Sequence, residues 1–135
     1  MNRTYLLDDV MQHKFEKGIS AEKLWEFVQD KKEQQFKLED VKHWIYTPCW
    51  STKDDCFISI YQVLMQKTKF KDHIKRIKKS NTDYPIVVIE DHNDNYGVIL
   101  DGNHRFAKQY MNNARNIKFK YITIKEFKKL ESSPQ

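Results

Sequence analysis

The sequence between residues 85 and 111 constrains the fold more than any other part of the chain. Residues 85–89 are a continuous β-branched run after a proline, which is typical of a buried strand. Residues 90–97 are polar and predict a turn, after which Val98, Ile99 and Leu100 form a second strand. Asp101 and Gly102 end that strand, and apolar residues at helical spacing predict a helix over 103–111. A strand, a hairpin and a helix in this order predict a small α+β domain with a mixed sheet flanked by helices.

Near the N-terminus, Ser20 has the character of a helix N-cap in front of a helical pattern over residues 21–32. Ile19 precedes the cap and is spaced to pack on Leu24 as a hydrophobic staple. We expect the buried stripe of this helix to consist of Leu24, Trp25, Phe27 and Val28.

The remaining elements are less distinct. Residues 36–41 alternate like a short strand, and residues 44–50 contain Pro48 and three large aromatic side chains, which indicates an ordered loop. An apolar stretch favours a helix over 56–65. We further expect a helix carrying Phe70, Ile74 and Ile77, a break over 81–85, a strand over 117–124 and a short helix over 125–130.

The length of 135 residues predicts one domain, which we divide into an N-terminal helical extension (1–35) and the α+β domain (36–135). The formal charge is −2 over residues 1–40 (seven basic and nine acidic) and +7 over residues 41–135 (17 basic and ten acidic). A basic second part suits an anionic partner, and it equally suits a lysine-rich surface in contact with water. The start of the chain carries acidic residues where a signal peptide requires a basic start, and no apolar run approaches about 20 residues. We therefore expect a cytoplasmic protein without a membrane partner.

Most of the candidate binding and catalytic residues lie in the motif Asp101-Gly-Asn-His-Arg105, hereafter the DGNHR motif. The first turn of a helix offers free backbone N–H groups and the positive end of the helix dipole, so it favours bound phosphate. Gly102 permits close approach of a ligand, Arg105 supplies a planar fork for phosphate oxygens, and His104 supplies a second donor. Asp101 and Asn103 are suited to hold Mg²⁺ against those phosphates. Alternatively, Asp101 or Asn103 merely caps the helix while His104 and Arg105 face water.

The DGNHR motif, followed by Ala107, resembles the signature of the ParB/sulfiredoxin superfamily, whose members carry related short motifs at a strand-to-helix turn. The sequence of the motif is most similar to that of the free-serine kinases related to ParB. The flanks are also similar, since Tyr84-Pro-Ile-Val-Val-Ile89 resembles the strand before the motif and residues 36–48 resemble the opening strand and proline loop. The chain departs from ParB at Asn103, where ParB has a glutamate, and at Cys49, where ParB has an arginine. Sulfiredoxin has its essential cysteine at the position that Asn103 occupies in this chain.

The resemblance implies a nucleotide-binding protein that acts as a phosphotransferase or an NTPase, with Mg²⁺ and ATP, ADP or another nucleotide. It implies that residues 102–105 bind the phosphates and that Asp101 and His104 take part in the chemistry. An acidic residue near the opening strand acts as general base in the kinase branch, and Glu39 or Asp40 matches that position.

Two alternatives stay open. One is a non-catalytic DNA- or RNA-binding module, in which Lys71, Lys75 and Lys78 contact the phosphate backbone. The other is a ParB-like nuclease. The small size of the chain is also typical of a phage or mobile-element protein.

Overall fold

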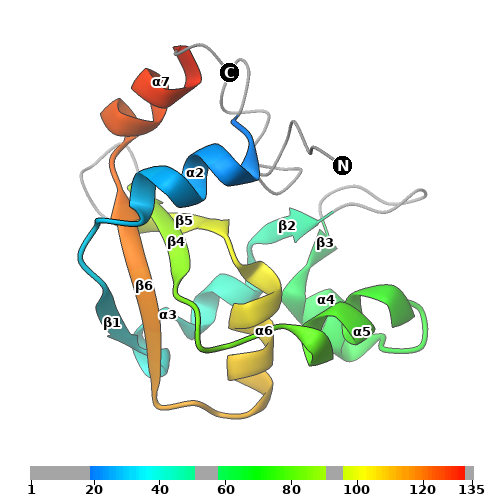
Figure 1. The fold of residues 1–135 in the computed structure, drawn as a ribbon. Coiled ribbons are helices and arrows are strands. Elements are labelled where there is room, and N and C mark those ends of the chain that lie inside the picture. Colours follow the sequence, from blue (N-terminus) through cyan, green and yellow to red (C-terminus); the bar gives the residue numbers. More distant parts are fainter. Residues whose placement is uncertain (1–18, 51–57, 91–95, 133–135) are drawn as a thin grey trace.

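The β-branched run after Pro85 lies inside a mixed four-stranded sheet in the computed structural model, which describes residues 19–50, 58–90 and 96–132 (Figure 1). In chain order the described elements are α2 (Ala21–Val28), β1 (Gln34–Lys37), α3 (Leu38–Val41), the 3-10 helix η1 (Lys42–Tyr46), β2 (Pro48–Trp50), β3 (Ile58–Ser59), α4 (Ile60–Met65), α5 (Lys71–Lys79), β4 (Ile86–Glu90), β5 (Tyr96–Asp101), α6 (Asn103–Met111), β6 (Asn116–Ile122) and α7 (Ile124–Ser132). The larger sheet has the order β1-β6-β4-β5, and β2 pairs with β3 in a separate sheet. The α+β fold class predicted from the sequence is confirmed.

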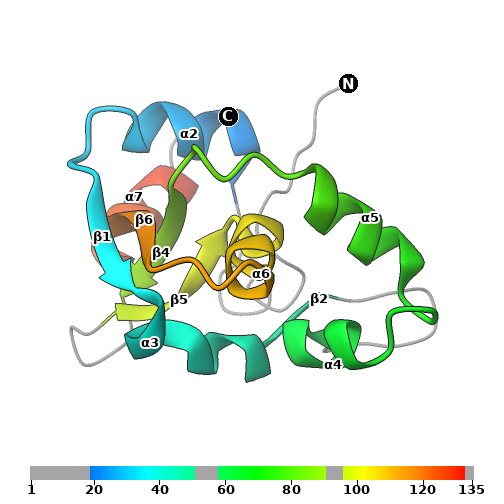
Figure 2. The ribbon, with the colours of Figure 1, turned by 90° about the horizontal axis from the view of Figure 1, so that it is seen from below.

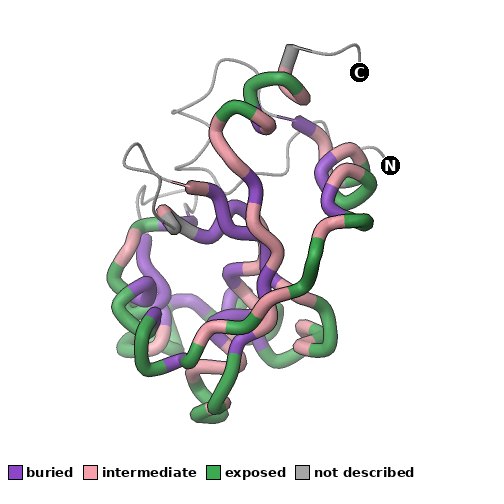
Figure 3. Tube along the Cα trace, turned by 90° about the vertical axis from the view of Figure 1, so that its left-hand side faces the viewer, coloured by how far each residue is buried: buried purple, intermediate pink, exposed green. Residues whose placement is uncertain are grey.

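Both faces of the sheet are covered, which explains why β4 is apolar at four successive positions. Ile86 and Val88 belong to a core cluster that includes Phe106 and Ala107 of α6. The alternate residues Val87 and Ile89 face a second cluster that includes side chains of α2 and α7. Figure 2 shows α6 beside the strands, with α2 well apart from it. In Figure 3 the buried residues gather in the interior and the exposed ones lie toward the outside. β4 and β6 run parallel, whereas β4 and β5 form an antiparallel hairpin.

The N-terminal helix begins as the sequence predicts and packs directly on the sheet. The hydroxyl of Ser20 accepts a hydrogen bond from the backbone N–H of Lys23. Ile19 and Leu24 are fully buried in the second cluster. Trp25 does not belong to the buried stripe, because 49% of its surface is exposed. Residues 1–18 of the predicted extension lie outside the described residues.

The segment after α2 differs from the prediction in its details. The strand is shorter and earlier than residues 36–41, since β1 ends at Lys37 and Leu38 starts the helix α3. Leu38 and Val41 are both buried. Their spacing of three residues fits a helix, while the same residues also fit the alternation of a strand. The predicted loop over 44–50 is the helix η1 followed by β2, and the predicted helix over 56–65 starts only at Ile60, after the strand β3.

The other predicted elements are present. The helices α5 and α6 and the strands β4, β5 and β6 agree with the expected segments within a few residues. The predicted turn between β4 and β5 falls largely on residues 91–95, outside the described part of the chain. None of the described helices combines the length and the apolar composition that a membrane-spanning segment requires.

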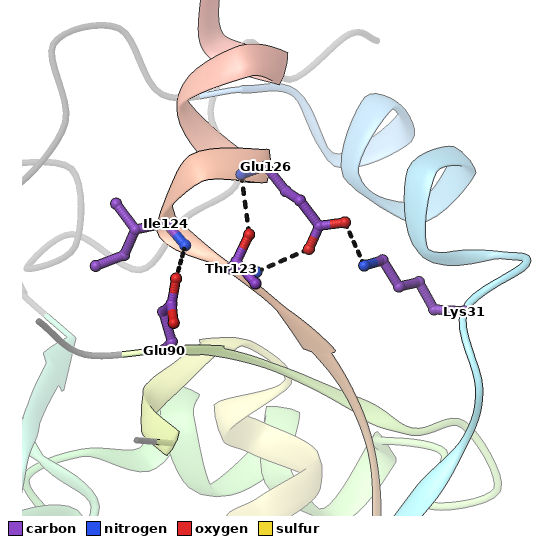
Figure 4. A network of polar contacts seen from close by, with 5 residues as sticks. All are labelled: Lys31, Glu90, Thr123, Ile124 and Glu126. Carbon is purple, nitrogen blue, oxygen red and sulfur yellow. Dashed lines mark hydrogen bonds and ion pairs between the residues drawn. The ribbon is translucent and has the colours of Figure 1, made fainter. Parts of the chain in front are cut away.

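A polar network fixes α7 to the end of the sheet (Figure 4). The hydroxyl of Thr123 accepts from the backbone N–H of Glu126 at 3.1 Å, and the carboxylate of Glu126 accepts from the backbone N–H of Thr123 at 2.9 Å. This reciprocal pair is a capping box. Glu126 also accepts from Lys31, and Glu90 accepts from the backbone N–H of Ile124. Burial acts to raise the pKa of Glu126, but the hydrogen bonds from Lys31 and Thr123 outweigh it and lower that pKa.

The turn from β5 into α6 requires glycine at position 102. The φ angle of Gly102 is 104°, in the left-handed region that side chains rarely adopt. A Cβ atom at this position would lie 2.9 Å from Cγ2 of Ile86 and 3.2 Å from its Cα. Both the backbone angle and the contact with β4 therefore make a side chain unfavourable here.

We expect Gly102→Ala to lower the free energy of unfolding by about 1–3 kcal/mol, because it adds backbone strain and a clash with Ile86. Urea denaturation measures this loss. Asn112→Ala, an exposed change after the other end of α6, serves as the control and should stay within about 0.5 kcal/mol of the unmodified protein. A Gly102→Ala protein as stable as this control would contradict the requirement for glycine.

Candidate functional site

The DGNHR motif forms the turn between β5 and α6. Asp101 is the last residue of β5, Gly102 is the N-cap of α6, and Asn103 is its first residue. The N-cap residue Gly102 has no side chain that could cap this helix end, and the first turn contains no acidic residue. The positive end of the α6 dipole is therefore not compensated by a side chain within the helix start.

The side chains of the motif point in different directions. Successive helical residues project about 100° apart, so His104 and Arg105 leave α6 in different directions. Asp101 and Arg105 are four residues apart and line one pocket. His104 instead reaches α5, and Asn103 is buried with only 5% of its surface exposed. The structure brings together Asp101 and Arg105 and places His104 in a separate cluster.

The pocket that Asp101 and Arg105 line, hereafter the Arg105 pocket, has a volume of about 600 Å³. This volume lies in the range of small-molecule binding sites. Its walls come from α2, from the residues before and in β4, from the turn and from β6. The lining residues are Trp25, Glu26, Val28, Gln29, Tyr84, Pro85, Val87, Asp101, Arg105 and Lys120.

Hydrogen bonds hold the polar side chains of the pocket in place. The indole N–H of Trp25 donates to Oδ2 of Asp101 at 3.0 Å. Nη1 of Arg105 donates to the carbonyl of Pro85 at 2.9 Å, and the guanidinium lies 5.9 Å from the centre of the Tyr84 ring. Nζ of Lys120 donates to two carbonyls at the end of α2, those of Val28 and Gln29. Each cation is thus positioned by main-chain oxygen and keeps further N–H donors for a ligand.

Charge and aromatic surface meet in this pocket. Arg105 and Lys120 supply two positive charges, and Asp101 and Glu26 supply two negative ones. Two of its rings are exposed, with 49% of the Trp25 surface and 62% of the Tyr84 surface accessible. A ligand that offers both an anionic group and a flat ring matches this lining better than a simple anion does.

His104 belongs to a second group of side chains, the His–Trp cluster, formed by Trp50, His73 and His104. Nδ1 of His73 and Nε2 of His104 lie 3.1 Å apart in a hydrogen bond. The Trp50 ring stacks on both imidazoles, with centroid distances of 4.4 Å to each. These contacts join β2, α5 and α6 at the start of both helices.

The environment of His104 keeps its imidazole neutral at pH 7. Burial, with additional repulsion from Arg76 and His73, lowers its pKa from the ordinary value of 6.5 to about 3. A neutral imidazole packed between α5 and α6 is a packing and hydrogen-bonding group in this geometry. The expected roles of His104 as phosphate ligand and catalytic residue find no support in its position.

The other predicted site residues lie at different places. Glu39 is exposed on α3, and its neighbour Leu38 donates to the carbonyl of Arg115, beyond the C-terminal end of α6. The DGNHR motif is at the opposite end of that helix, so the structure does not bring Glu39 or the exposed Asp40 to the turn. Lys71, Lys75 and Lys78 are exposed on α5.

For Mg²⁺, Asp101 is the suitable ligand at the turn. Among the residues that the structure describes, no three His, Cys, Asp or Glu side chains gather as a metal site. Magnesium is commonly held by one or two carboxylates together with the phosphates of its ligand. Asp101 fits this arrangement through the oxygen that does not bond Trp25, whereas the buried Asn103 lies outside the lining of the pocket.

Of the ten residues that line the pocket, the sequence predicts only Asp101 and Arg105 as site residues. Those that it misses include Trp25, Tyr84 and Lys120, which are far apart in the chain. The pattern placed Trp25 in a buried stripe, and Lys120 has no local feature that separates it from other lysines. Lys120 reaches the pocket because it lies directly opposite Val87 in the β4–β6 pairing. His73 of the His–Trp cluster was missed for the same reason.

Comparison of the chain with protein-family models, with curated proteins and with solved structures finds no match in any of the three. The resemblance to the ParB/sulfiredoxin superfamily therefore rests on the DGNHR motif and its flanking segments.

We expect acid to destabilise the protein through His104. The unfolded chain binds a proton on this imidazole below about pH 6.5, whereas the folded protein does so only near pH 3. The contribution of His104 to the free energy of unfolding is therefore complete above pH 6.5 and is lost as the pH falls. Between pH 7 and pH 5 the loss amounts to about 2 kcal/mol. Urea denaturation at both pH values should show this difference, and His104→Gln should remove it.

The matched control is His43→Gln, because His43 is an exposed histidine outside the cluster. Its pH-dependent loss should equal that of the unmodified protein. If His104→Gln retains the full loss between pH 7 and pH 5, the neutral packing role of His104 is wrong.

Proposed function

We propose that the protein binds a nucleotide in the Arg105 pocket and acts on its phosphates as a phosphotransferase or an NTPase. One observation carries the proposal: the pocket joins two positioned cations, Arg105 and Lys120, with two exposed aromatic rings, Trp25 and Tyr84. A nucleotide is the common metabolite class that combines a phosphate chain with a flat base.

The phosphates are assigned to the Arg105 side of the pocket. The bond to Pro85 uses one of the five N–H donors of the guanidinium, and the others suit a bidentate contact with phosphate oxygens. The uncapped start of α6 lies at the same turn and favours negative charge there. Lys120 retains one of its three N–H donors after its bonds to the end of α2. The resemblance of the DGNHR motif to phosphate-binding turns agrees with this assignment.

The base is assigned to Trp25 or Tyr84, which offer accessible ring surface at the pocket. Stacking of a base on an aromatic side chain contributes about 1–3 kcal/mol and tolerates any base. The hydrogen bond of Trp25 to Asp101 fixes the indole and the carboxylate relative to each other. Asp101 would hold Mg²⁺ bound to the phosphates, where it neutralises charge that develops as a phosphoryl group is transferred.

Arg105→Lys should weaken nucleotide binding about ten- to hundred-fold, because lysine keeps the charge and loses the planar fork. Thermal-shift and calorimetric titrations with ATP, ADP, CTP and GTP in the presence of Mg²⁺ measure this change. Arg76→Lys, at an exposed arginine of α5 outside the pocket, is the matched control and should bind like the unmodified protein.

The proposal fails if no nucleotide raises the melting temperature of the unmodified protein, or if Arg105→Lys binds as tightly as Arg76→Lys. Release of phosphate, or its transfer to an added hydroxyl compound, then separates catalysis from binding alone.

Nucleotide binding should also quench the tryptophan fluorescence through Trp25. Trp44 and Trp50 are buried, with 5% and 4% of their surfaces exposed, so Trp25 is the accessible indole. Trp25→Phe should abolish the quench while calorimetry still detects binding, since phenylalanine keeps a stacking ring. A quench that survives in Trp25→Phe would place the base elsewhere.

A further inference from the structure

The positive charge of the protein is concentrated in one short segment. Residues 67–79 contain seven basic side chains and one acidic side chain, a formal charge of +6. The whole chain has a formal charge of +5, so all other residues together carry −1. The basic character of the protein is therefore a property of α5 and the residues just before it.

Three lysines of α5 form a single row, hereafter the lysine row: Lys71, Lys75 and Lys78. Their spacing of four and three residues places them on one face of the helix. All three side chains are exposed, and none forms an ion pair with another described residue. Lys71 and Lys78 are seven positions apart, which corresponds to about 10 Å along the helix axis. Phosphates along one strand of duplex DNA rise by about 3.4 Å each along the helix axis, so the length of the row is comparable to the rise of about three phosphates.

The rest of α5 is anchored, so that the lysine row is presented on a rigid element. Ile77 is fully buried and His73 belongs to the His–Trp cluster. Lys108 of α6 donates to the carbonyls of Lys78 and Ser80 and thereby caps the end of α5.

We infer that the lysine row is a binding surface for the phosphate backbone of duplex DNA. The exposed positions of α5 carry charged side chains and no apolar or aromatic side chain. A membrane-surface helix needs an apolar face to insert, and a single-strand site needs rings on which bases stack. Charge without either feature favours a duplex, whose bases are already stacked. Duplex DNA is preferred to duplex RNA because its major groove admits a helix, whereas that of RNA is deep and narrow.

The test is binding of a labelled 20-base-pair DNA duplex, measured by fluorescence anisotropy between 50 and 200 mM salt. For three phosphate contacts, the logarithm of the affinity should fall against the logarithm of the salt concentration with a slope of about −2.7. The triple variant Lys71→Gln/Lys75→Gln/Lys78→Gln should bind at least ten-fold more weakly at 50 mM salt and show a slope near zero. The corresponding Lys→Arg triple variant should retain the affinity and the slope.

The matched control removes the same charge elsewhere, by Lys32→Gln/Lys125→Gln/Lys128→Gln at three exposed lysines outside α5. This control should retain most of the affinity. Equal losses in the two triple glutamine variants would show an effect of net charge alone and overturn the inference. It is also overturned if the unmodified protein does not bind the duplex, or if a single strand, duplex RNA or vesicles containing phosphatidylserine bind through the same lysines more tightly. Because the lysine row lies outside the Arg105 pocket, Arg105→Lys should leave duplex binding unchanged, which separates this inference from the proposed nucleotide site.

Discussion

The left-handed backbone of Gly102, pressed against Ile86 at the start of β4, is the constraint on which the site depends. It lets β5 end and α6 begin within a single residue. Asp101 and Arg105 then stand on either side of the turn and face the same pocket. A longer connection would separate the carboxylate from the guanidinium and would move the uncapped end of α6 away from both.

α6 also links the two surfaces that we assign to ligands. One side of its first turn supplies Arg105 to the pocket, and the adjacent residue, His104, bonds His73 of α5. The stack of Trp50 on both imidazoles and the cap that Lys108 provides fix α5 against α6. The lysine row is therefore held rigidly beside the helix that supplies Arg105 to the pocket.

The predictable parts of the fold are those in which the local pattern and the tertiary packing agree. β4 was recognisable because both of its faces are buried, and α6 because its apolar spacing starts directly after a glycine. The prediction failed where one pattern suits two structures. Alternation from Phe36 to Leu38 suits a strand, whereas burial of Leu38 and Val41 suits the short helix that forms.

The α+β class, the strand-to-helix turn and the residues that the turn carries could be predicted from the sequence, because each follows from local hydrophobic periodicity and from the freedom of glycine. Which of those residues line the pocket depends on tertiary packing. Periodicity reports that a side chain is buried or exposed on one element, but not which distant element covers it. Trp25, Tyr84 and Lys120 meet Arg105 because α2 and β6 pack beside the turn, and His104 is withdrawn because α5 packs on its other side.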